Sequence, residues 1–557
     1  MSIYRNCNDV SLKILYPSNK RYLYATTQEF YKKDPGTLAR YIREGIPWPD
    51  DRQAIFPLEV VKEFYTDLWG TEPEVTIPFN RPSTNSDEVS EEIILRPITA
   101  KEIKSRITRI KNGSAPGPDG IRKNQIVNKE AQESLRLFYN LILVSRAHPT
   151  EWNKNRTILL PKQGKDPENI GNYRPITIGS ILGRVYWGII DTRLRSLTTF
   201  SNRQKGFVAE SGCHNNVYIL NELLRTAKTD KGIVVVQLDI TKAFDTIPHQ
   251  ALIPALERMG IPASVRNYIA SSYRQLTTKI EYKGSTTDVS LNRGVKQGDP
   301  LSLYIFNAIM NPLLETLEQL GGYSIKGAHT MTALAFADDL ILVADDHHTA
   351  QKLLVLTERY FIQLGMTISA QKCASFQIRT TRDSWHMIDT HLSLANGAII
   401  PSVPANDNIT YLGGLISPWS GLQYKGLTEK LHQALQRLGC TSLKPHQKLN
   451  LLSTHIIPYF LYASSLASPP ITLVRGMDSS IRTHVKDILH LPSCTPNGLL
   501  YCSKRDGGLG IPKLENLGVC TALKQGMQLL TTTDTATQAL LKASKFELRM
   551  EKMAKSI

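Results

Sequence analysis

The stretch that most constrains the fold runs from Thr332 to Asp346 and reads TALAFADDLILVADD. Two apolar runs that favour β-strands flank the adjacent acids Asp338 and Asp339, which predicts a hairpin with both carboxylates at its turn. At about 4 Å and an effective dielectric constant near 20, two such charges repel by about 4 kcal/mol, so a cation should lie beside them. A divalent metal ion is the economical choice. A solvated hairpin tip, where aspartate is common, explains the same residues, and a third acid from elsewhere is needed to separate the two.

The length and charge of the chain favour a large globular protein with a polyanionic partner. Its 557 residues suffice for about two to four structural units, and 41% apolar with 21% charged residues is a globular composition. The 66 basic residues exceed the 50 acidic ones, which gives a formal net charge of +16. Nucleic acid is the leading partner for such a surplus, and a merely basic soluble protein is the alternative.

The cysteines and the apolar segments indicate a soluble, intracellular protein. Seven cysteines are scattered without any C-x-x-C pair, which favours reduced thiols. His490, Cys494 and Cys502 lie close together, but their spacing fits no common zinc finger, and we interpret them as structural. The N-terminus is too polar for a signal peptide, and the most apolar region, 451–474, is interrupted by polar residues and three prolines.

A second hairpin is predicted from two short β-runs, at 152–161 and 173–177, which a polar turn separates. Lys162 and Arg174 lie at the facing ends of these strands. Because arginine matches phosphate oxygens bidentately, the pair could hold a phosphate group. An ordinary solvated hairpin is the alternative. Upstream, the glycine- and proline-rich run at 113–120 predicts a shaped loop.

Asp239 supplies the third acid. It ends the run GIVVVQLD, whose β-branched residues predict a central strand covered by helices. Carboxylates at a strand end and at a hairpin turn of one antiparallel sheet can meet around two metal ions about 3.5–4 Å apart. With Lys162 and Arg174 they would complete a phosphoryl-transfer site. Asp345 and Asp346 precede a periodic helix, and we interpret them as its N-terminal cap.

Helices are predicted from their period and their caps. Apolar residues at helical spacing predict helices over 56–69 and 300–320, the second of which Asp299 can cap. Thr99 and Glu102 form a capping-box pattern at the start of another helix. The mixture of helices and strands places the chain in the α+β class.

Eight stretches, in order along the chain, resemble the reverse transcriptases of non-LTR (LINE-type) retrotransposons, especially those that insert into ribosomal RNA genes. They cover roughly residues 90 to 420 and read SAPGPDGI, LLPKQGKDPENIGNYRPIT, RQKGF, QLDITKAFDTIPH, GVKQGDPLS, LAFADDLIL, GMTISAQKC and YLGG. The resemblance implies a right-hand polymerase with fingers, a palm that holds an antiparallel sheet, and a helical thumb. It also implies an RNA-directed DNA polymerase that copies an RNA template into cDNA by two-metal nucleotidyl transfer.

By motif position, the resemblance implies roles for individual residues. The metal-binding acids would be Asp239, Asp338 and Asp339, with the backbone carbonyl of Ile240 as a further ligand. Lys372 matches a lysine thought to protonate the leaving pyrophosphate. The remaining implied roles are triphosphate binding (Lys162, Arg174), exclusion of a ribose 2′-hydroxyl (Phe244), packing on template and incoming nucleotide (Gln297, Gly298) and the primer grip (Tyr411, Leu412, Gly413).

The same motifs divide the chain into predicted domains. These are an N-terminal extension at 1–88 that ends in a linker at 73–88, fingers at 89–238, a palm at 239–418 and a helical thumb with the C-terminal segment at 419–557, the reverse transcriptase domain as a whole covering about 143–418.

Cofactors and partners follow from the implied reaction. We expect two Mg²⁺ ions, for which Mn²⁺ could substitute, an RNA template, a DNA primer or nicked target DNA, dNTPs, and no membrane. The protein is expected in the nucleus or cytoplasm, and in the nucleus for target-primed synthesis. The alternatives are a group II intron maturase or domesticated reverse transcriptase, and an inactive RNA-binding protein that retains the fold.

The chain departs from the family pattern at Leu303 and Tyr304, where relatives have a proline and another apolar residue. Full-length relatives also carry DNA-binding fingers, a zinc knuckle and an endonuclease. This sequence has no Cys/His cluster or endonuclease acid pattern. We therefore expect either a fragment or an element that borrows its nicking activity, and integration is not assigned to it.

Overall fold

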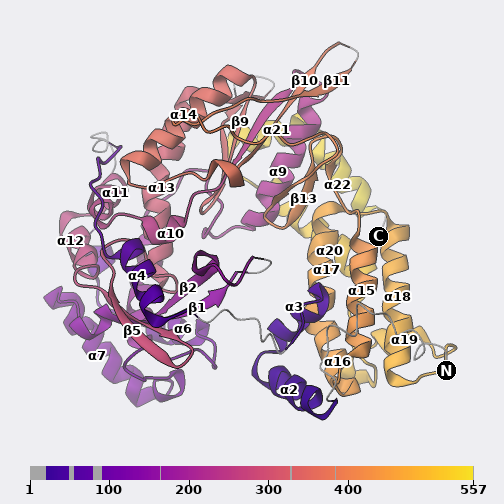
Figure 1. The fold of residues 1–557 in the computed structure, drawn as a ribbon, viewed down its shortest axis with the longest axis horizontal. Coiled ribbons are helices and arrows are strands. Elements are labelled where there is room, and N and C mark those ends of the chain that lie inside the picture. Colours follow the sequence, from indigo (N-terminus) through magenta and orange to yellow (C-terminus); the bar gives the residue numbers. More distant parts are fainter. Residues whose placement is uncertain are drawn as a thin grey trace. The chain divides into compact units, whose positions relative to one another are not determined.

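The chain forms two compact units in a computed structural model (Figure 1). The structure describes residues 20–48, 56–79, 91–162, 165–325, 329–382 and 384–555. The larger unit comprises Ala54–Asn216 and Ala227–Val403, and the smaller unit comprises Met1–Gln53, Val217–Thr226 and Pro404–Ile557. The predicted linker at 73–88 extends past residue 79 and so lies partly outside the described residues. The predicted domain boundaries stay a prediction.

Both units combine helices with antiparallel strand pairs, which confirms the mixed helix-and-sheet class. The helices and strands of the larger unit are α4 (Leu58–Trp69), α5 (Glu91–Leu95), α6 (Ala100–Arg109), α7 (Lys129–Ser145), β1 (Lys154–Pro161), β2 (Tyr173–Ile178), α8 (Ile181–Leu197), β3 (Ile233–Leu238), α10 (Ala243–Thr246), α11 (Leu252–Arg258), α12 (Ala263–Ser271), β4 (Thr277–Tyr282), β5 (Ser285–Ser290), α13 (Pro300–Leu320), β6 (Tyr323–Ser324), β7 (Thr330–Met331), β8 (Ala333–Phe336), β9 (Asp339–Ala344), α14 (His347–Gln363), β10 (Ala374–Thr380) and β11 (Trp385–Ile388). Those of the smaller unit are α2 (Lys20–Lys33), α3 (Pro35–Glu44), β12 (Ile409–Tyr411), β13 (Gly414–Ser417), β14 (Gly421–Leu422), α15 (Leu427–Cys440), α16 (Pro445–Leu451), α17 (Ile457–Ala467), α18 (Ile471–Leu489), α19 (Asn497–Tyr501), α20 (Leu514–Leu530), α21 (Thr535–Ala543) and α22 (Phe546–Ala554), while α9 (Gly212–Ala227) contributes to both units.

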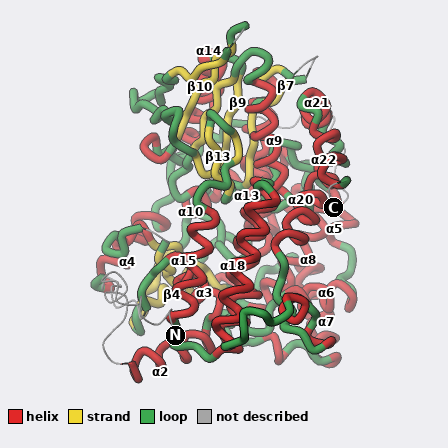
Figure 2. Tube along the Cα trace, turned by 90° about the vertical axis from the view of Figure 1, so that its right-hand side faces the viewer, coloured by secondary structure: helices red, strands yellow, loops and turns green. Residues whose placement is uncertain are grey.

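Strand β3 is the centre of a five-stranded sheet with the order β11-β10-β3-β9-β8. All neighbouring strands in this sheet are antiparallel. The run 233–236 is fully buried, as expected for a continuous β-branched strand with both faces covered. Helix α14 packs against β3 and β9, and α13 contacts β8. Figure 2 shows α14 beside the strands labelled β9 and β10. The predicted central strand and the predicted hairpin of β8 and β9 are both confirmed.

A four-stranded sheet with the order β2-β1-β4-β5 carries the second predicted hairpin. Strands β1 and β2 pair antiparallel, with Leu160 opposite Arg174, which confirms the predicted pairing. Strand β4 joins β1 in parallel, a contact that the sequence analysis did not foresee. Helix α4 packs on β5 at the edge of this sheet. The hairpin is therefore one half of a larger sheet.

Each unit has its own hydrophobic core. In the larger unit, α13 contributes the most continuous stretch, since almost every side chain from Leu301 to Leu314 is buried. Leu303 and Tyr304, which depart from the family pattern, both lie within this helix. The hydroxyl of Tyr304 lies 2.9 Å from Oγ1 of Thr198, which satisfies this buried polar group.

The core of the smaller unit lies among its long helices. Helix α17 packs against α20, and α18 packs against both α15 and α20, as Figure 1 shows. Helix α3 joins this bundle through contacts with α15, so residues near the N-terminus complete a core that the C-terminal helices begin. Among the residues that the structure describes, no helix is long and apolar enough to span a bilayer.

The predicted helix caps are confirmed, with one exception. Thr99 and Glu102 form the reciprocal capping box of α6, and Asp299 accepts a hydrogen bond from the amide of Leu301 at the start of α13. Asp346 caps α14. The prediction that Asp345 belongs to the same cap is wrong. Its carboxylate instead accepts hydrogen bonds from Ser324 and lies 2.8 Å from Nζ of Lys231, because tertiary partners outcompete the local cap.

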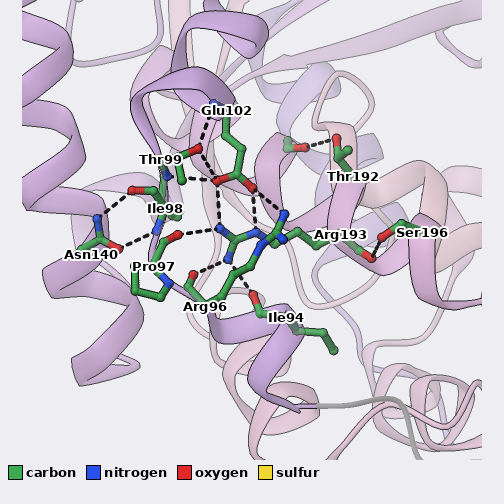
Figure 3. Close-up of polar contacts among 11 residues, drawn as sticks. Ile94, Arg96, Pro97, Ile98, Thr99, Glu102, Asn140, Thr192, Arg193 and Ser196 are labelled. Carbon is green, nitrogen blue, oxygen red and sulfur yellow. Dashed lines mark hydrogen bonds and ion pairs between the residues drawn. The ribbon is translucent and has the colours of Figure 1, made fainter.

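Arg193 of α8 is the buried anchor of the segment that leads into α6 (Figure 3). Its guanidinium donates to both carboxylate oxygens of Glu102, at 3.0 and 3.1 Å, and to the carbonyls of Ile94, Arg96 and Pro97 at 2.7, 2.7 and 3.3 Å. Partial burial raises the pKa of Glu102, but hydrogen bonds from Arg193 and Thr99 outweigh it and lower this pKa to about 2. One side chain thus fixes the chain path from α5 to α6.

Replacing Arg193 with methionine should lower the free energy of unfolding by about 3 to 5 kcal/mol, because it leaves three carbonyls without this donor and removes the buried ion pair with Glu102, whose remaining hydrogen bonds come from Thr99. The urea midpoint measures the loss. Since the pKa of Glu102 is depressed, the stabilisation is complete above about pH 4.5 and is lost as the pH falls through about 2. Arg136→Met is the control, because its ion pair with Glu133 on α7 is solvent-exposed and should contribute less than about 1 kcal/mol. Equal effects of the two changes would contradict the anchoring role.

Candidate active site

The three predicted acids lie at the ends of neighbouring strands of the five-stranded sheet. Asp239 directly follows β3, and Asp338 lies in the two-residue turn between β8 and β9, whose end residues Phe336 and Asp339 pair with each other. The segment just before β10 holds the backbone at Asp239. Its carbonyl accepts a hydrogen bond from the amide of Ser369 at 2.9 Å, and its amide lies 3.3 Å from Sγ of Cys373. Because β3 and β9 are adjacent, the three acids lie at the same end of the sheet and act on one another electrostatically.

Burial and neighbouring carboxylates raise the pKa values of the paired acids Asp338 and Asp339. For Asp339, burial is the larger cause and the carboxylates of Asp338 and Asp239 add to it, which raises its pKa to about 6. The pKa of Asp338 is also raised, first by burial and then by Asp239, while its own backbone amide and the guanidinium of Arg174 act in the opposite direction. Negative charge is therefore in excess at this turn.

The donor set suits a divalent metal ion. Three carboxylates offer hard oxygen ligands, and a bound cation would offset the repulsion between them. Within the described ranges, no three His, Cys, Asp or Glu side chains lie close enough to form a complete metal-binding group. Ile240, whose carbonyl is the further ligand of the prediction, is buried and forms an antiparallel bridge with Ile368.

Cationic side chains gather beside these acids. Nζ of Lys372 lies 3.8 Å from Oδ1 of Asp239, and both side chains are about half exposed, at 58% and 43%. The ammonium group of Lys162 is half-buried. Burial and then the charge of Lys372 lower its pKa, while Asp245 and Asp239 oppose the shift and Arg174 adds to it. The structure therefore brings Lys162, Arg174 and Lys372 into one electrostatic environment with the acids.

The loop at Gln297 and Gly298 connects the four-stranded sheet to helix α10. The carbonyl of Gln297 accepts from the amide of Thr177 on β2 at 3.1 Å, and Nε2 of Gln297 donates to Asp245 at 3.2 Å. Gly298 has a φ of +127°, and an added Cβ would lie 2.7 Å from the carbonyl oxygen of Thr177. Only glycine allows this close approach.

Phe244 lies on α10, just after the strand that ends at Asp239. Its ring stacks on Phe306 of α13 with the centroids 4.3 Å apart and the planes at 18°, and Phe207 contacts it at 6.1 Å. One ring face is thus packed against the core while the side chain remains half-buried. This placement is compatible with both the sugar gate and ordinary packing, and the gate stays a prediction.

Two charged residues beside the site were missed in the sequence analysis. Burial raises the pKa of Asp245 to about 6, although Lys242 and Gln297 act against the shift. Burial lowers the pKa of Lys242 to about 8, and its Nζ lies 3.9 Å from the ring centroid of Phe64 on α4. No local pattern marked either residue, because a lysine and an aspartate are ordinary in a turn such as TKAFDT.

The predicted primer-grip residues lie in the smaller unit. Leu412 and Gly413 form the two-residue turn between β12 and β13, with φ values of 48° and 79°. The hydroxyl of Tyr462 on α17 donates to the carbonyl of Leu412 at 2.8 Å, and Tyr411 is fully buried. The turn is therefore held rigidly, and its role in binding a primer stays a prediction.

Comparison with known proteins relates the chain to a large group of mobile elements. Residues 160–416 match the sequence model of the family described as "Reverse transcriptase (RNA-dependent DNA polymerase)". The retrovirus-related Pol polyprotein of a type-1 retrotransposable element R2 from Popillia japonica is 36% identical over 423 residues, which are 75% of this chain and 58% of that protein. The corresponding polyprotein of the type-2 element R2DM from Drosophila melanogaster is 31% identical over 89% of this chain and 46% of its own length.

A more distant relative is the RNA-directed DNA polymerase of the mobile element jockey from Drosophila melanogaster, which is 24% identical over 50% of this chain and 32% of that protein. The chain spans about half the length of the two R2 polyproteins, at 58% and 46%. The similarity therefore concerns the segment that contains the three acids and the residues around them.

Proposed function

We propose that the chain is a reverse transcriptase of the type found in non-LTR retrotransposons, to which its residues 160–416 and its R2 relatives point, and that it copies an RNA template into cDNA by two-metal nucleotidyl transfer. The observation that supports this most directly is the coupling of Asp239, Asp338 and Asp339. The charge of Asp239 adds to burial in raising the pKa values of Asp338 and Asp339 at the end of one sheet, beside Lys162, Arg174 and Lys372. Such a distribution suits a divalent cation on one side and a triphosphate on the other.

The three carboxylates, with the carbonyl of Ile240, would hold two Mg²⁺ ions, and Mn²⁺ is expected to substitute. Bound ions would lower the pKa of the primer 3′-hydroxyl and neutralise charge on the leaving pyrophosphate. Because Asp339 has a pKa of about 6, protons compete with the metal, and metal affinity should fall as the pH drops below that value.

The surrounding side chains would bind and orient the substrates. Lys162 and Arg174 would hold the triphosphate oxygens, and Nζ of Lys372 would keep a proton available for the pyrophosphate oxygen as it leaves. Phe244 would exclude a 2′-hydroxyl. The remaining groups would position the nucleic acid strands, at the loop of Gln297 and Gly298 for the template and at the turn of Tyr411, Leu412 and Gly413 for the primer.

A right-hand arrangement of fingers, palm and thumb is part of this proposal. The five-stranded sheet would be the palm, the four-stranded sheet the fingers and the helices of the smaller unit the thumb. The partners would be an RNA template, a DNA primer or nicked target DNA, and dNTPs. We place the protein in the nucleus for target-primed synthesis.

Primer extension tests the activity. The purified chain is incubated with a DNA primer annealed to a heteropolymeric RNA template, the four dNTPs and Mg²⁺. We expect full-length, alkali-resistant cDNA whose sequence is complementary to the RNA, and no product when the template is digested with RNase beforehand. RNA binding without any extension, with Mg²⁺ or Mn²⁺, would instead support an inactive RNA-binding protein.

The net charge of +16 predicts a steep salt dependence of RNA binding. Because each neutralised phosphate releases counterions, a protein with about 6 to 10 phosphate contacts should lose about 10³-fold or more in affinity between 50 and 200 mM salt. Filter binding or fluorescence anisotropy over this range measures the slope. Asp338→Asn serves as the control and should retain it. A nearly flat log–log plot would contradict the interpretation of the charge.

A further inference from the structure

The segment 203–206 forms an additional edge beside the hairpin that carries the acids. Gln204 forms a parallel bridge with Ala335 of β8. The amide of Lys205 donates to the carbonyl of Ala335 at 2.8 Å, and the amide of Ala335 donates to the carbonyl of Arg203 at 3.0 Å. The segment therefore runs along β8 toward the turn.

The side chain of Gln204 is directed at the turn itself. This side chain is 3% exposed. Its Oε1 accepts hydrogen bonds from the amides of Ala337 and Gly206, both at 2.8 Å, and its Nε2 donates to the carbonyl of Ala337 at 3.4 Å. One amide group thus satisfies both backbone polar groups of the residue that immediately precedes Asp338.

Ala337 adopts a backbone conformation that alanine disfavours. Its φ is +55°, and it is the one residue of the two-residue turn with a positive φ. The Cβ atom of an L-residue crowds the following carbonyl there, so the conformation persists only where the surroundings impose it. The two hydrogen bonds between Gln204 and the backbone of Ala337 supply that constraint.

Contacts with helix α13 hold the segment 203–206 in place, so that it can fix the conformation of the turn. Nδ2 of Asn307 on α13 donates to the carbonyl of Gly206 at 2.8 Å, and the guanidinium of Arg203 lies 2.9 Å from Glu318 on the same helix. Gly206 packs directly against the turn, because an added Cβ would lie 2.2 Å from the amide nitrogen of Ala337. The segment therefore connects the long buried helix α13 to the turn.

We propose that Gln204 is a positioning residue for the polymerisation site, which it serves by holding Ala337 in its strained conformation and so orienting the carboxylates of Asp338 and Asp339. The expected effect of Gln204 on the rate rests on the proposed function, whereas its expected effect on the backbone of the turn does not. Gln204 contacts neither substrate nor metal. Its removal should let the turn relax and misplace the carboxylates, and small misplacements in an active site reduce the rate strongly.

Gln204→Leu tests the proposal with two readouts. Single-turnover incorporation of one dNTP on a primed RNA template should slow about 10- to 100-fold, while the affinity for primer–template changes less than about twofold. Independently of activity, hydrogen–deuterium exchange in a peptide over residues 333–340 should accelerate, because the amide of Ala337 loses its acceptor. A rate within about twofold of the wild type, or unchanged exchange in this peptide, would overturn the proposal.

A second variant keeps the proposal testable if Gln204→Leu does not fold. Gln204→Glu is isosteric and keeps the oxygen that accepts from Ala337 and Gly206, but it loses the donor to the carbonyl of Ala337. We expect a rate loss together with a smaller increase in exchange than in Gln204→Leu. Wild-type values for both would overturn the proposal. If the wild-type protein itself lacks polymerase activity, the proposed function fails, and the exchange measurement still decides whether Gln204 holds the turn.

Asn216→Leu is the matched control. Asn216 is also a fully buried amide that donates to the hairpin, but its partner is the carbonyl of Ala335, at 3.0 Å, and Lys205 also donates to that carbonyl. The control should lower thermal stability and leave both the single-turnover rate and the exchange of the turn amides within about twofold of wild type. A loss of rate in the control equal to that of Gln204→Leu would mean that any buried amide in the region matters equally, and would overturn the assignment.

Discussion

Replacing Asp338 with asparagine should lower the rate of nucleotide incorporation by at least about 10³-fold and leave RNA affinity within about twofold of the wild type. An amide cannot supply the anionic charge that two divalent ions require, and loss of such a ligand costs several kcal/mol in the transition state. The change also removes one of the charges that raise the pKa of Asp339. Single-turnover extension of a primed RNA template measures the rate, and anisotropy measures the affinity. Activity above about a tenth of the wild type would contradict an essential role as a ligand.

Asp345→Asn is the matched control for this experiment. Asp345 belongs to the same acid-rich stretch but lies after the far end of β9, where it pairs with Lys231 and Ser324. The change should weaken that pair and lower stability modestly, with an incorporation rate within about twofold of wild type. A large loss of rate in this control would show that activity responds to any lost charge in the stretch rather than to the metal-binding acids.

Replacing Phe244 with alanine should increase the use of ribonucleotides about 100-fold relative to deoxynucleotides. A 2′-hydroxyl pressed against an aromatic ring clashes with it and loses its hydrogen bonds to water, and such mismatches cost a few kcal/mol. Because the side chain of Phe244 is only half-buried, the change should open space next to the site. Single-nucleotide extension with dGTP and GTP on the same primed RNA template gives the discrimination ratio.

Phe200→Ala is the control for the alternative that Phe244 merely packs in the core. Phe200 is a partly buried ring on the same core, with its centroid 5.3 Å from that of Tyr304. Its removal should lower stability while the ratio of dGTP to GTP use stays at the wild-type value. If Phe244→Ala likewise leaves the ratio unchanged and only lowers stability, Phe244 is a packing residue and the sugar is selected elsewhere.

Features that depend on neighbouring residues in the chain could be predicted from the sequence. The strand that ends at Asp239 is recognisable because a buried strand needs a continuous apolar run, and the hairpin at Asp338 is recognisable because two such runs flank a short polar turn. The start of α13 was predicted from Asp299 and the following proline, because capping is a contact between residues two or three apart.

Features that depend on distant residues could not be predicted in this way. The parallel pairing of β4 with β1 joins residues more than a hundred positions apart, and no local period marks it. Gln204 contacts Ala337 across 133 positions, so the sequence showed the residue within a familiar motif without showing its partner. The error at Asp345 has the same cause, since Lys231 lies far away in the sequence.

In the candidate site, too, residues placed by local structure could be predicted and residues placed by tertiary contacts could not. Spacing identified the acids because strand and hairpin fix where their carboxylates lie. It did not identify Asp245, which becomes part of the site only because the loop at Gln297 folds back over α10. The tertiary fold determines which side chains surround the acids.

Iron-mediated cleavage tests most directly whether the three carboxylates together bind the metal ions of polymerisation. Fe²⁺ replaces Mg²⁺ in the protein bound to primer and RNA template, and ascorbate with peroxide then generates hydroxyl radicals that cut the backbone near the bound ion. We predict cuts close to Asp239 and close to Asp338 and Asp339, which excess Mg²⁺ suppresses and Asp338→Asn weakens. Cleavage at other positions alone, or cleavage at these positions that Mg²⁺ does not suppress, would contradict a shared metal site.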